Sequence, residues 1–331
     1  MDVLLSAPIL FFGLGALMAL AGARIPFPDG FGKALAAYLL VAIGLQGGAA
    51  LAGASVAAVL PLLLTAALIS FAMPALAFAL LRGPVGLDRV NAAAIAAHYG
   101  SVSLVTFVTA TKLLEAQGIS FGGHMVAALA IMEAPAIVTG LLLSGRVGLA
   151  ARGGMEQGGG TMAVSLGGGG LSSGLREAAF NGSILLLTGS LLVGLIIGAP
   201  GLAKLSGLFV APWDGALCLF LLDMGHLAAS RMRQAAALNL RLLGFGLVMP
   251  LLGAAIGLSA SLPLGLGLGD TVLLVTLCAS ASYIAVPAAL RHALPDADPG
   301  LSLPLSLAVT FPFNILIGIP LYLAVCRHLL G

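Results

Sequence analysis

The stretch Tyr99-Gly100-Ser101-Val102-Ser103 interrupts a long apolar segment in the first half of the chain, and Ala279-Ser280-Ala281-Ser282-Tyr283 interrupts another in the second half. Gly100 weakens the continuity of a helix, and Pro287, just beyond the second stretch, has no backbone N–H to donate. Paired interruptions in corresponding membrane helices are typical of a transporter's substrate site. We therefore predict that helices break at both stretches.

The composition places the chain in a lipid bilayer. Hydrophobic residues make up 60% of its 331 residues and charged residues only 8%, whereas soluble domains carry about 25% charged residues. The net charge of +2 comes from basic residues scattered singly along the chain, which gives no footprint for nucleic acid. No HExxH, Walker A or GxGxxG unit appears, so nothing indicates an enzyme. We expect an all-α integral membrane protein.

Apolar segments long enough to cross a bilayer, about 20 residues each, follow one another along the chain with short loops between them. We place about ten of them, at 5–22, 31–51, 57–81, 90–113, 122–145, 179–199, 205–229, 238–260, 270–292 and 302–328. Gly and Ser crowd the region in the middle, which has the composition of a flexible linker. The predicted domains are a first five-helix repeat over 1–145, a glycine-rich linker over 146–178 and a second five-helix repeat over 179–331.

The two halves resemble each other. At one constant offset Ser101 overlies Ser280, and Ser103 overlies Ser282. An odd number of spans in each repeat makes the two halves cross the membrane in opposite directions. We therefore predict inverted repeats.

The basic residues lie mostly on one side of the predicted spans. Of the 14 Lys and Arg residues, all but Lys112, Lys204 and Arg327 fall on the same side. By the positive-inside rule that side is the cytoplasm. Both termini then lie outside the cytoplasm, and the glycine-rich linker lies inside.

The interrupted stretches are the predicted substrate site. A break exposes backbone N–H groups at the start of one half-helix, where the positive end of the helix dipole favours an anion. The serine hydroxyls add further ligands. The alternative is that these small residues only allow close helix packing. The predicted substrate-binding residues are Gly100, Ser101, Val102, Ser103, Ala279, Ser280, Ala281 and Ser282.

Glu133 lies in the middle of an apolar span, where a carboxylate costs about 2.5–3.5 kcal/mol on insertion scales. Binding of Na⁺, or protonation, would offset that cost. The alternative is a protonated Glu that is hydrogen-bonded to a neighbouring helix. Asn314 lies at a similar depth in the last span, either as a neutral oxygen ligand or as an interhelical hydrogen bond. With Ser282, these are the candidate Na⁺ ligands.

His98 precedes the first break by two residues, and Tyr283 closes the second interrupted stretch. His98 could sense pH near the site, or it could be a neutral, hydrogen-bonded residue of the interior. We retain both residues as further candidates for the site.

At these residues the chain resembles the sodium-dependent bicarbonate transporter family first known from cyanobacteria. The similarity covers both halves and nearly all the predicted spans, and it is weakest in the linker. The matching stretches are 43–48, Gly100-Ser101, 132–138, Met224-Gly225, Ser230-Arg231, 280–291, Pro312 and 318–321.

The resemblance implies two inverted five-helix repeats that form a core domain and a gate domain, assembled as trimers. It also implies bicarbonate held between the N-termini of crossing broken helices, Na⁺ bound beside it, and transport by an elevator-like slide of the core. The cyanobacterial members bind a PII-like regulator through a charged cytoplasmic linker, whereas the linker here is rich in glycine. We do not carry that partner over.

The chain departs from the family's pattern next to the predicted site. Tyr283 stands where the family has Asp in its second serine motif. Glu133 stands where the family has Asp in the motif over 132–138. Val102 replaces a Thr, Ala281 interrupts the serine run, and Ala285-Val286 replace Ser-Gly. These departures leave the identity of the anion and the number of coupled Na⁺ ions open.

The sequence thus predicts a secondary active transporter of the bacterial inner membrane, with Na⁺ as coupling ion and no organic cofactor. Its leading substrate is bicarbonate or a similar small anion. A proton-coupled transporter or exchanger of a small organic carboxylate, with Glu133 and His98 as the titrating pair, is the alternative. A membrane scaffold that transports nothing is a third.

Overall fold

The computed structural model of the chain describes residues 6–145, 182–236 and 238–330. These residues form helices and connecting loops and contain no β-strand, which confirms the predicted all-α class. The predicted linker over 146–178 lies outside the described residues.

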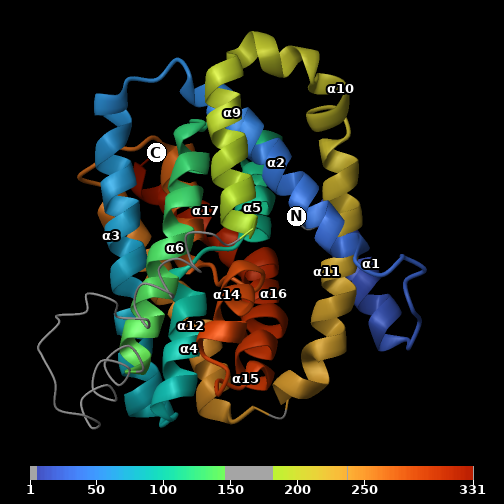
Figure 1. Ribbon diagram of the computed structural model, residues 1–331, viewed down its shortest axis with the longest axis vertical. Coiled ribbons are helices and arrows are strands. Elements are labelled where there is room, and N and C mark those ends of the chain that lie inside the picture. The colour runs from blue at the N-terminus through green and yellow to red at the C-terminus, as the bar shows by residue number, and fades with distance from the viewer. Residues whose placement is uncertain (1–5, 146–181, 237, 331) are drawn as a thin grey trace, which may run out of the picture.

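The helices follow one another along the chain and run mostly along the long axis of the molecule (Figure 1). The first half contains α1 (Ala7–Leu20), α2 (Phe31–Leu51), α3 (Val56–Leu80), the π-helix η1 (Leu81–Val85), α4 (Arg89–Gly100), α5 (Leu104–Ala116) and α6 (His124–Ser144). The second half begins with α9 (Gly182–Lys204), α10 (Ser206–Phe209), α11 (Trp213–Ala236), α12 (Leu240–Ser261), α13 (Leu268–Ala279) and α14 (Ala285–Ala293). It ends with α15 (Pro299–Pro304), the π-helix η2 (Leu305–Thr310), α16 (Phe311–Phe313), the π-helix η3 (Asn314–Gly318) and α17 (Ile319–Leu330).

Eight helical segments among the described residues are long and apolar enough to cross a membrane. They coincide with eight of the ten predicted spans. The other two positions hold shorter apolar helices, α1 with 14 residues and α13 with 12. A multi-pass membrane protein is therefore confirmed, while the count of ten spans and the inverted repeats stay predictions.

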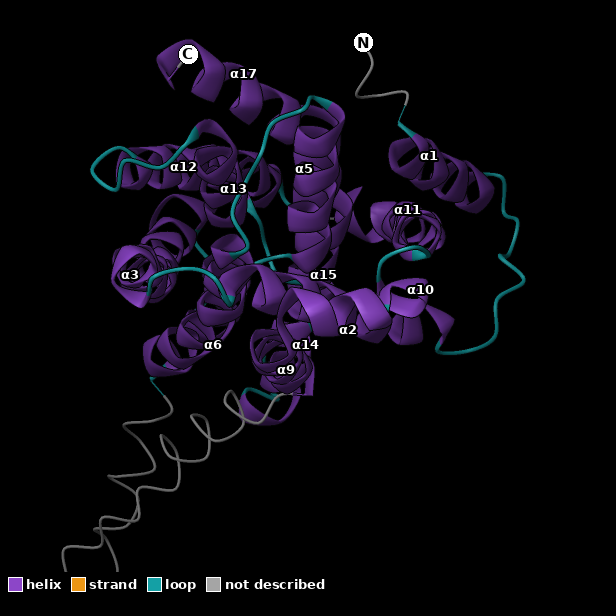
Figure 2. Cartoon of the chain, turned by 90° about the horizontal axis from the view of Figure 1, so that it is seen from above, coloured by secondary structure: helices purple, strands orange, loops and turns teal. Residues whose placement is uncertain are grey.

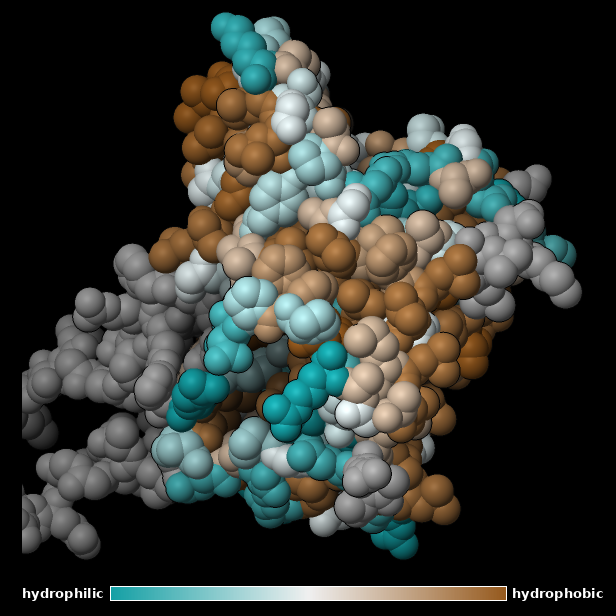
Figure 3. Space-filling view, turned by 90° about the vertical axis from the view of Figure 1, so that its right-hand side faces the viewer, coloured by the Kyte–Doolittle hydropathy of each residue, from teal (hydrophilic) through white to brown (hydrophobic). Residues whose placement is uncertain are grey.

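The outer faces of the long helices carry large apolar side chains that are exposed to the surroundings. Leu64 and Leu68 on α3, Ile196 on α9 and Val248 on α12 are examples. In the view of Figure 3, apolar side chains cover much of the face, and hydrophilic ones gather around a hollow in its lower half, in a patch at its upper right and at its top end. Such surfaces are suited to lipid tails rather than to water.

Both predicted helix breaks are present. α4 ends at Gly100 and α5 begins at Leu104, while α13 ends at Ala279 and α14 begins at Ala285. The residue after each first half-helix is extended, with φ −82° and ψ 170° at Ser101 and φ −87° and ψ 165° at Ser280. The two interruptions therefore begin with the same extended backbone conformation.

Gly100 ends its helix where the backbone is tightly enclosed. A Cβ atom there would overlap the ring of Pro74 on α3 and approach Ala136 on α6. The absent side chain thus lets α3 and α6 close around the first break.

Glycines also allow two pairs of helices to pack with their backbones close together. α1 packs along α11, and α2 packs along α9. Figure 2 shows α1, α10 and α11 on one side of the molecule, α3 and α12 on the opposite side, and α5 and α13 between them. On α9, a Cβ atom at Gly194 would overlap the backbone carbonyl of Leu45 on α2. Small residues at such contacts are what membrane helices need to approach closely.

We predict that Gly194→Ala lowers the apparent melting temperature of the purified protein, because the added methyl group meets backbone that cannot rotate away. Overpacking of this kind costs about 1–3 kcal/mol. Gly189→Ala on the same helix is the matched control. A Cβ there has nothing within 4 Å, so the substitution should leave stability unchanged or raise it. Equal effects of the two substitutions would contradict the close approach of α2 and α9.

Candidate functional site

The two helix breaks cross each other and are joined by three hydrogen bonds. The Ser103 N–H donates to Ser280 Oγ at 2.9 Å. The Ser282 N–H donates to the His98 carbonyl at 2.8 Å. The His98 ring Nδ1 lies 2.6 Å from the Ser282 carbonyl. All four residues are buried, so the crossing is fixed by bonds that water cannot replace.

His98 takes part in this crossing through both its backbone and its ring. A carbonyl can only accept, so Nδ1 must carry the hydrogen of the bond to Ser282. His98 is 1% exposed. The structure thus places His98 in the scaffold that holds the second break, and it does not line the pocket described next.

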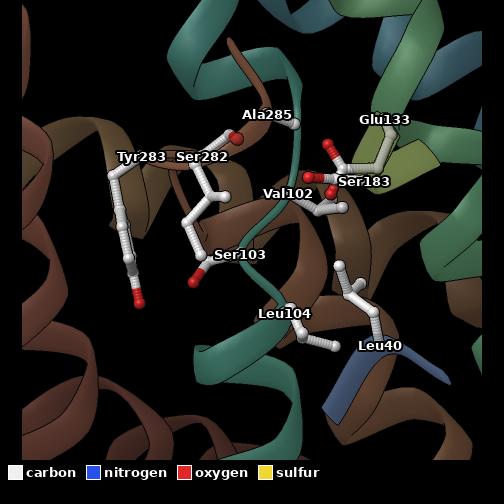
Figure 4. A pocket seen from close by; sticks show the side chains of 10 residues that line it. Leu40, Val102, Ser103, Leu104, Glu133, Ser183, Ser282, Tyr283 and Ala285 are labelled. Carbon is white, nitrogen blue, oxygen red and sulfur yellow. The ribbon is translucent and has the colours of Figure 1, made fainter. Parts of the chain in front are cut away.

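A small pocket opens at the crossing. Figure 4 shows its lining, with Tyr283 on one side, Glu133 and Ser183 on the other, and Ser103 and Ser282 between. The lining residues are Leu40, Val102, Ser103, Leu104, Glu133, Ser183, Ser282, Tyr283, Ile284 and Ala285. They include the residues at which α5 and α14 begin.

The start of a helix presents backbone N–H groups that have no acceptor within the helix. At α5, Ser103 caps the Thr106 N–H through its hydroxyl, at 3.3 Å. At α14, Ser282 Oγ lies 3.5 Å from the Val286 N–H. Two positive helix ends therefore point to one pocket, and a small anion is the ligand that they favour.

Glu133 brings a carboxylate from α6 to the same pocket. Its side chain is 6% exposed, and the Ser101 hydroxyl donates to Oε2 at 2.7 Å. Among the described residues that line the pocket there is no Lys, Arg or His. A buried carboxylate without a cationic partner is unstable as such, so this site needs either a bound cation or a proton.

Apart from Asn314, the predicted site residues divide into two groups. Val102, Ser103, Ser282, Glu133 and Tyr283 line the pocket. The others are buried and do not line it: Gly100, Ser101, Ala279, Ser280, Ala281 and His98.

Asn314 lies apart from the pocket and makes interhelical hydrogen bonds. Its side-chain amide donates to the carbonyl of Ala279 at 2.8 Å, and its Oδ1 accepts from the Tyr322 hydroxyl at 2.8 Å. It thereby occupies the last carbonyl of α13, which the helix itself leaves unsatisfied.

Five lining residues did not come from the sequence analysis. Leu104, Ile284 and Ala285 directly follow the two interrupted stretches, so extending each stretch to the next helix start would have found them. Leu40 and Ser183 come from α2 and α9, and no local pattern marks them. Their place depends on how α2 and α9 pack against the crossing.

The donor set is one of oxygens. Within the described ranges, no three His, Cys, Asp or Glu residues gather to hold a metal ion. A carboxylate, hydroxyls and carbonyls suit a hard cation such as Na⁺ rather than a transition metal.

Comparison with curated proteins gave no match. The sequence profile of the Na⁺-dependent bicarbonate transporter superfamily matches residues 7–327, nearly the whole chain. The protein therefore belongs to the Na⁺-dependent bicarbonate transporter superfamily, a family of membrane transporters.

Proposed function

We propose that the protein couples the inward movement of Na⁺ to the uptake of bicarbonate or a similar small anion. One observation carries the proposal: the starts of two broken helices and one buried carboxylate meet in a single pocket. The helix starts attract an anion, and the carboxylate attracts a cation.

The anion binds at the starts of α5 and α14, with the hydroxyls of Ser103 and Ser282 as further donors. Several N–H groups of the interrupted stretches are already used within the protein, including those of Ser103 and Ser282. The first-turn N–H groups of α5, at Leu104 and Val105, precede any intrahelical acceptor. We therefore assign the anion to the helix starts rather than to the middle of each stretch.

The cation binds at Glu133, with Ser282, which lines the same pocket, as a second oxygen ligand. Ser101 holds the carboxylate in position through its 2.7 Å hydrogen bond. Asn314 Oδ1 already accepts from Tyr322 and has one further lone pair. We keep it as a candidate ligand for a conformation in which the end of α13 moves.

Coupling follows from the charges. A lone anion or cation in this pocket would have to cross the apolar barrier as uncompensated charge, which is costly. Bound together, Na⁺ and the anion compensate each other and lower that cost. The inward Na⁺ gradient then drives uptake of the anion.

The proposed architecture consists of two inverted repeats, 1–145 and 179–331. In support, α4 and α13 both have 12 residues and both end where a helix breaks. Helix α1 packs with α11, and α9 packs in turn with α2, as two repeats related by a pseudo-two-fold axis would do. We propose that the crossing moves as one body against α1, α2, α9 and α11 during transport, in an elevator-like slide.

The proposed setting is the bacterial inner membrane, with both termini outside the cytoplasm and the protein assembled as a trimer. The distribution of Lys and Arg supports the orientation. The family supports the assembly only by resemblance, and a PII-like regulator is not part of the proposal.

The rival is a proton-coupled transporter of a small organic carboxylate on the same scaffold. The described pocket lining contains no cationic side chain. This favours the proton-coupled transporter as well, because a proton also neutralises Glu133. It assigns proton transfer to His98, whose ring is engaged with the Ser282 carbonyl.

We expect proteoliposomes that contain the full-length protein to accumulate labelled bicarbonate when an inward Na⁺ gradient is imposed, and not when choline replaces Na⁺. A pH gradient in the absence of Na⁺ is the second arm. Uptake that follows the pH gradient and ignores Na⁺ would instead establish the proton-coupled rival.

We expect Glu133→Gln to abolish the Na⁺ dependence of uptake, because it removes the one carboxylate of the pocket. Loss of a charge-assisted ligand costs about 1.5–3 kcal/mol, which is about tenfold or more in apparent Na⁺ affinity. Glu115→Gln is the control, since Glu115 is an exposed residue on α5 paired with Lys112. Both variants are compared by uptake at varied Na⁺ and by their melting temperatures. Unchanged Na⁺ dependence in Glu133→Gln would contradict the assignment of Glu133 as a Na⁺ ligand.

A further inference from the structure

The hydroxyl of Tyr283 is a buried polar group that the crossing does not use. Tyr283 lines the pocket and is 8% exposed. Its oxygen makes no hydrogen bond of normal geometry with the described residues. Burying a hydroxyl without a partner costs free energy, so its position calls for a ligand.

The Tyr283 ring is held in place by its neighbours. It packs against the ring of Phe311, with centroids 5.2 Å apart, and Phe311 packs in turn against Phe12. This packing fixes the direction in which the hydroxyl points. Figure 4 shows it beside the hydroxyl of Ser103, the residue that caps α5.

The donors around this point are all neutral. They are the starts of α5 and α14 and the hydroxyls of Ser103, Ser282 and Tyr283. Among the lining residues described, the one full charge is the negative carboxylate of Glu133. With one monovalent cation beside it, such a pocket can compensate one negative charge on a ligand, whereas a second would remain uncompensated in an apolar environment.

We infer that Tyr283 is a substrate-binding residue, whose hydroxyl donates a hydrogen bond to one oxygen of a monovalent oxyanion seated at the start of α5. This inference rests on the proposed function for the place of the anion. It adds a residue that touches the substrate, and it limits the substrate class to singly charged oxyanions. Sulfate and dicarboxylates are excluded by their second charge.

The test compares wild type with Tyr283→Phe, using labelled bicarbonate in proteoliposomes under a fixed Na⁺ gradient. We expect KM to rise about tenfold or more, as for a lost hydrogen bond to a charged ligand, while the maximal rate changes less than about twofold. Tyr38→Phe is the control for KM, because the Tyr38 hydroxyl donates to the Leu208 carbonyl away from the pocket.

Melting temperatures without substrate separate binding from structure. The Tyr283 hydroxyl makes no hydrogen bond of normal geometry and has the Ser103 hydroxyl beside it, so Tyr283→Phe should change the melting temperature little. Tyr99→Phe should be less stable, since the Tyr99 hydroxyl lies 2.6 Å from Thr310 Oγ1.

The outcomes distinguish this inference from the proposed function. If wild type does not transport bicarbonate, bicarbonate is not the substrate. Formate, acetate and nitrate are then tested by the change that each causes in the melting temperature of the protein in the presence of Na⁺. The inference stands if one of these monoanions stabilises wild type and its apparent affinity falls in Tyr283→Phe. It is overturned if the Phe variant matches wild type for each monoanion, if no monoanion binds wild type, or if sulfate or succinate binds as well.

Discussion

The crossing of two broken helices is the constraint on which the rest of the molecule depends. Three buried hydrogen bonds join the breaks, through Ser103 to Ser280 and between His98 and Ser282. In a membrane interior, backbone groups freed from a helix must find partners inside the protein. Each break supplies partners for the other, so neither would be stable alone. The crossing therefore sets where the starts of α5 and α14 lie.

Glycines let the helices around this crossing pack closely against their neighbours. Gly100 admits Pro74 and Ala136, and Gly194 admits the Leu45 backbone. Lipid tails are as apolar as the helices, so close packing rather than hydrophobic burial has to hold them together. The same packing brings Leu40 and Ser183 to the pocket from helices that contain no break.

The electrostatics of the pocket follow from what surrounds it. Glu133 is buried with one hydroxyl donor and without a basic residue among the described lining. The positive helix ends favour an anion and the carboxylate favours a cation, so the pocket suits a pair of bound ions of opposite charge. The neutral hydroxyls add directed hydrogen-bond donors without adding charge, which is the basis for proposing a small, singly charged substrate.

The sequence by itself determined the helical class and both breaks, and it singled out Glu133, because hydropathy, glycine, serine and a lone carboxylate leave local signals in an apolar chain. It also marked Ser103, Ser282 and Tyr283 before their surroundings were known. It did not separate the pocket from its scaffold. Only the tertiary structure decided that Ser280 and His98 serve the crossing and that Asn314 holds the end of α13. The reason is physical: a hydroxyl, an imidazole or an amide takes its role from the partner that it meets, and those partners lie far away in the chain.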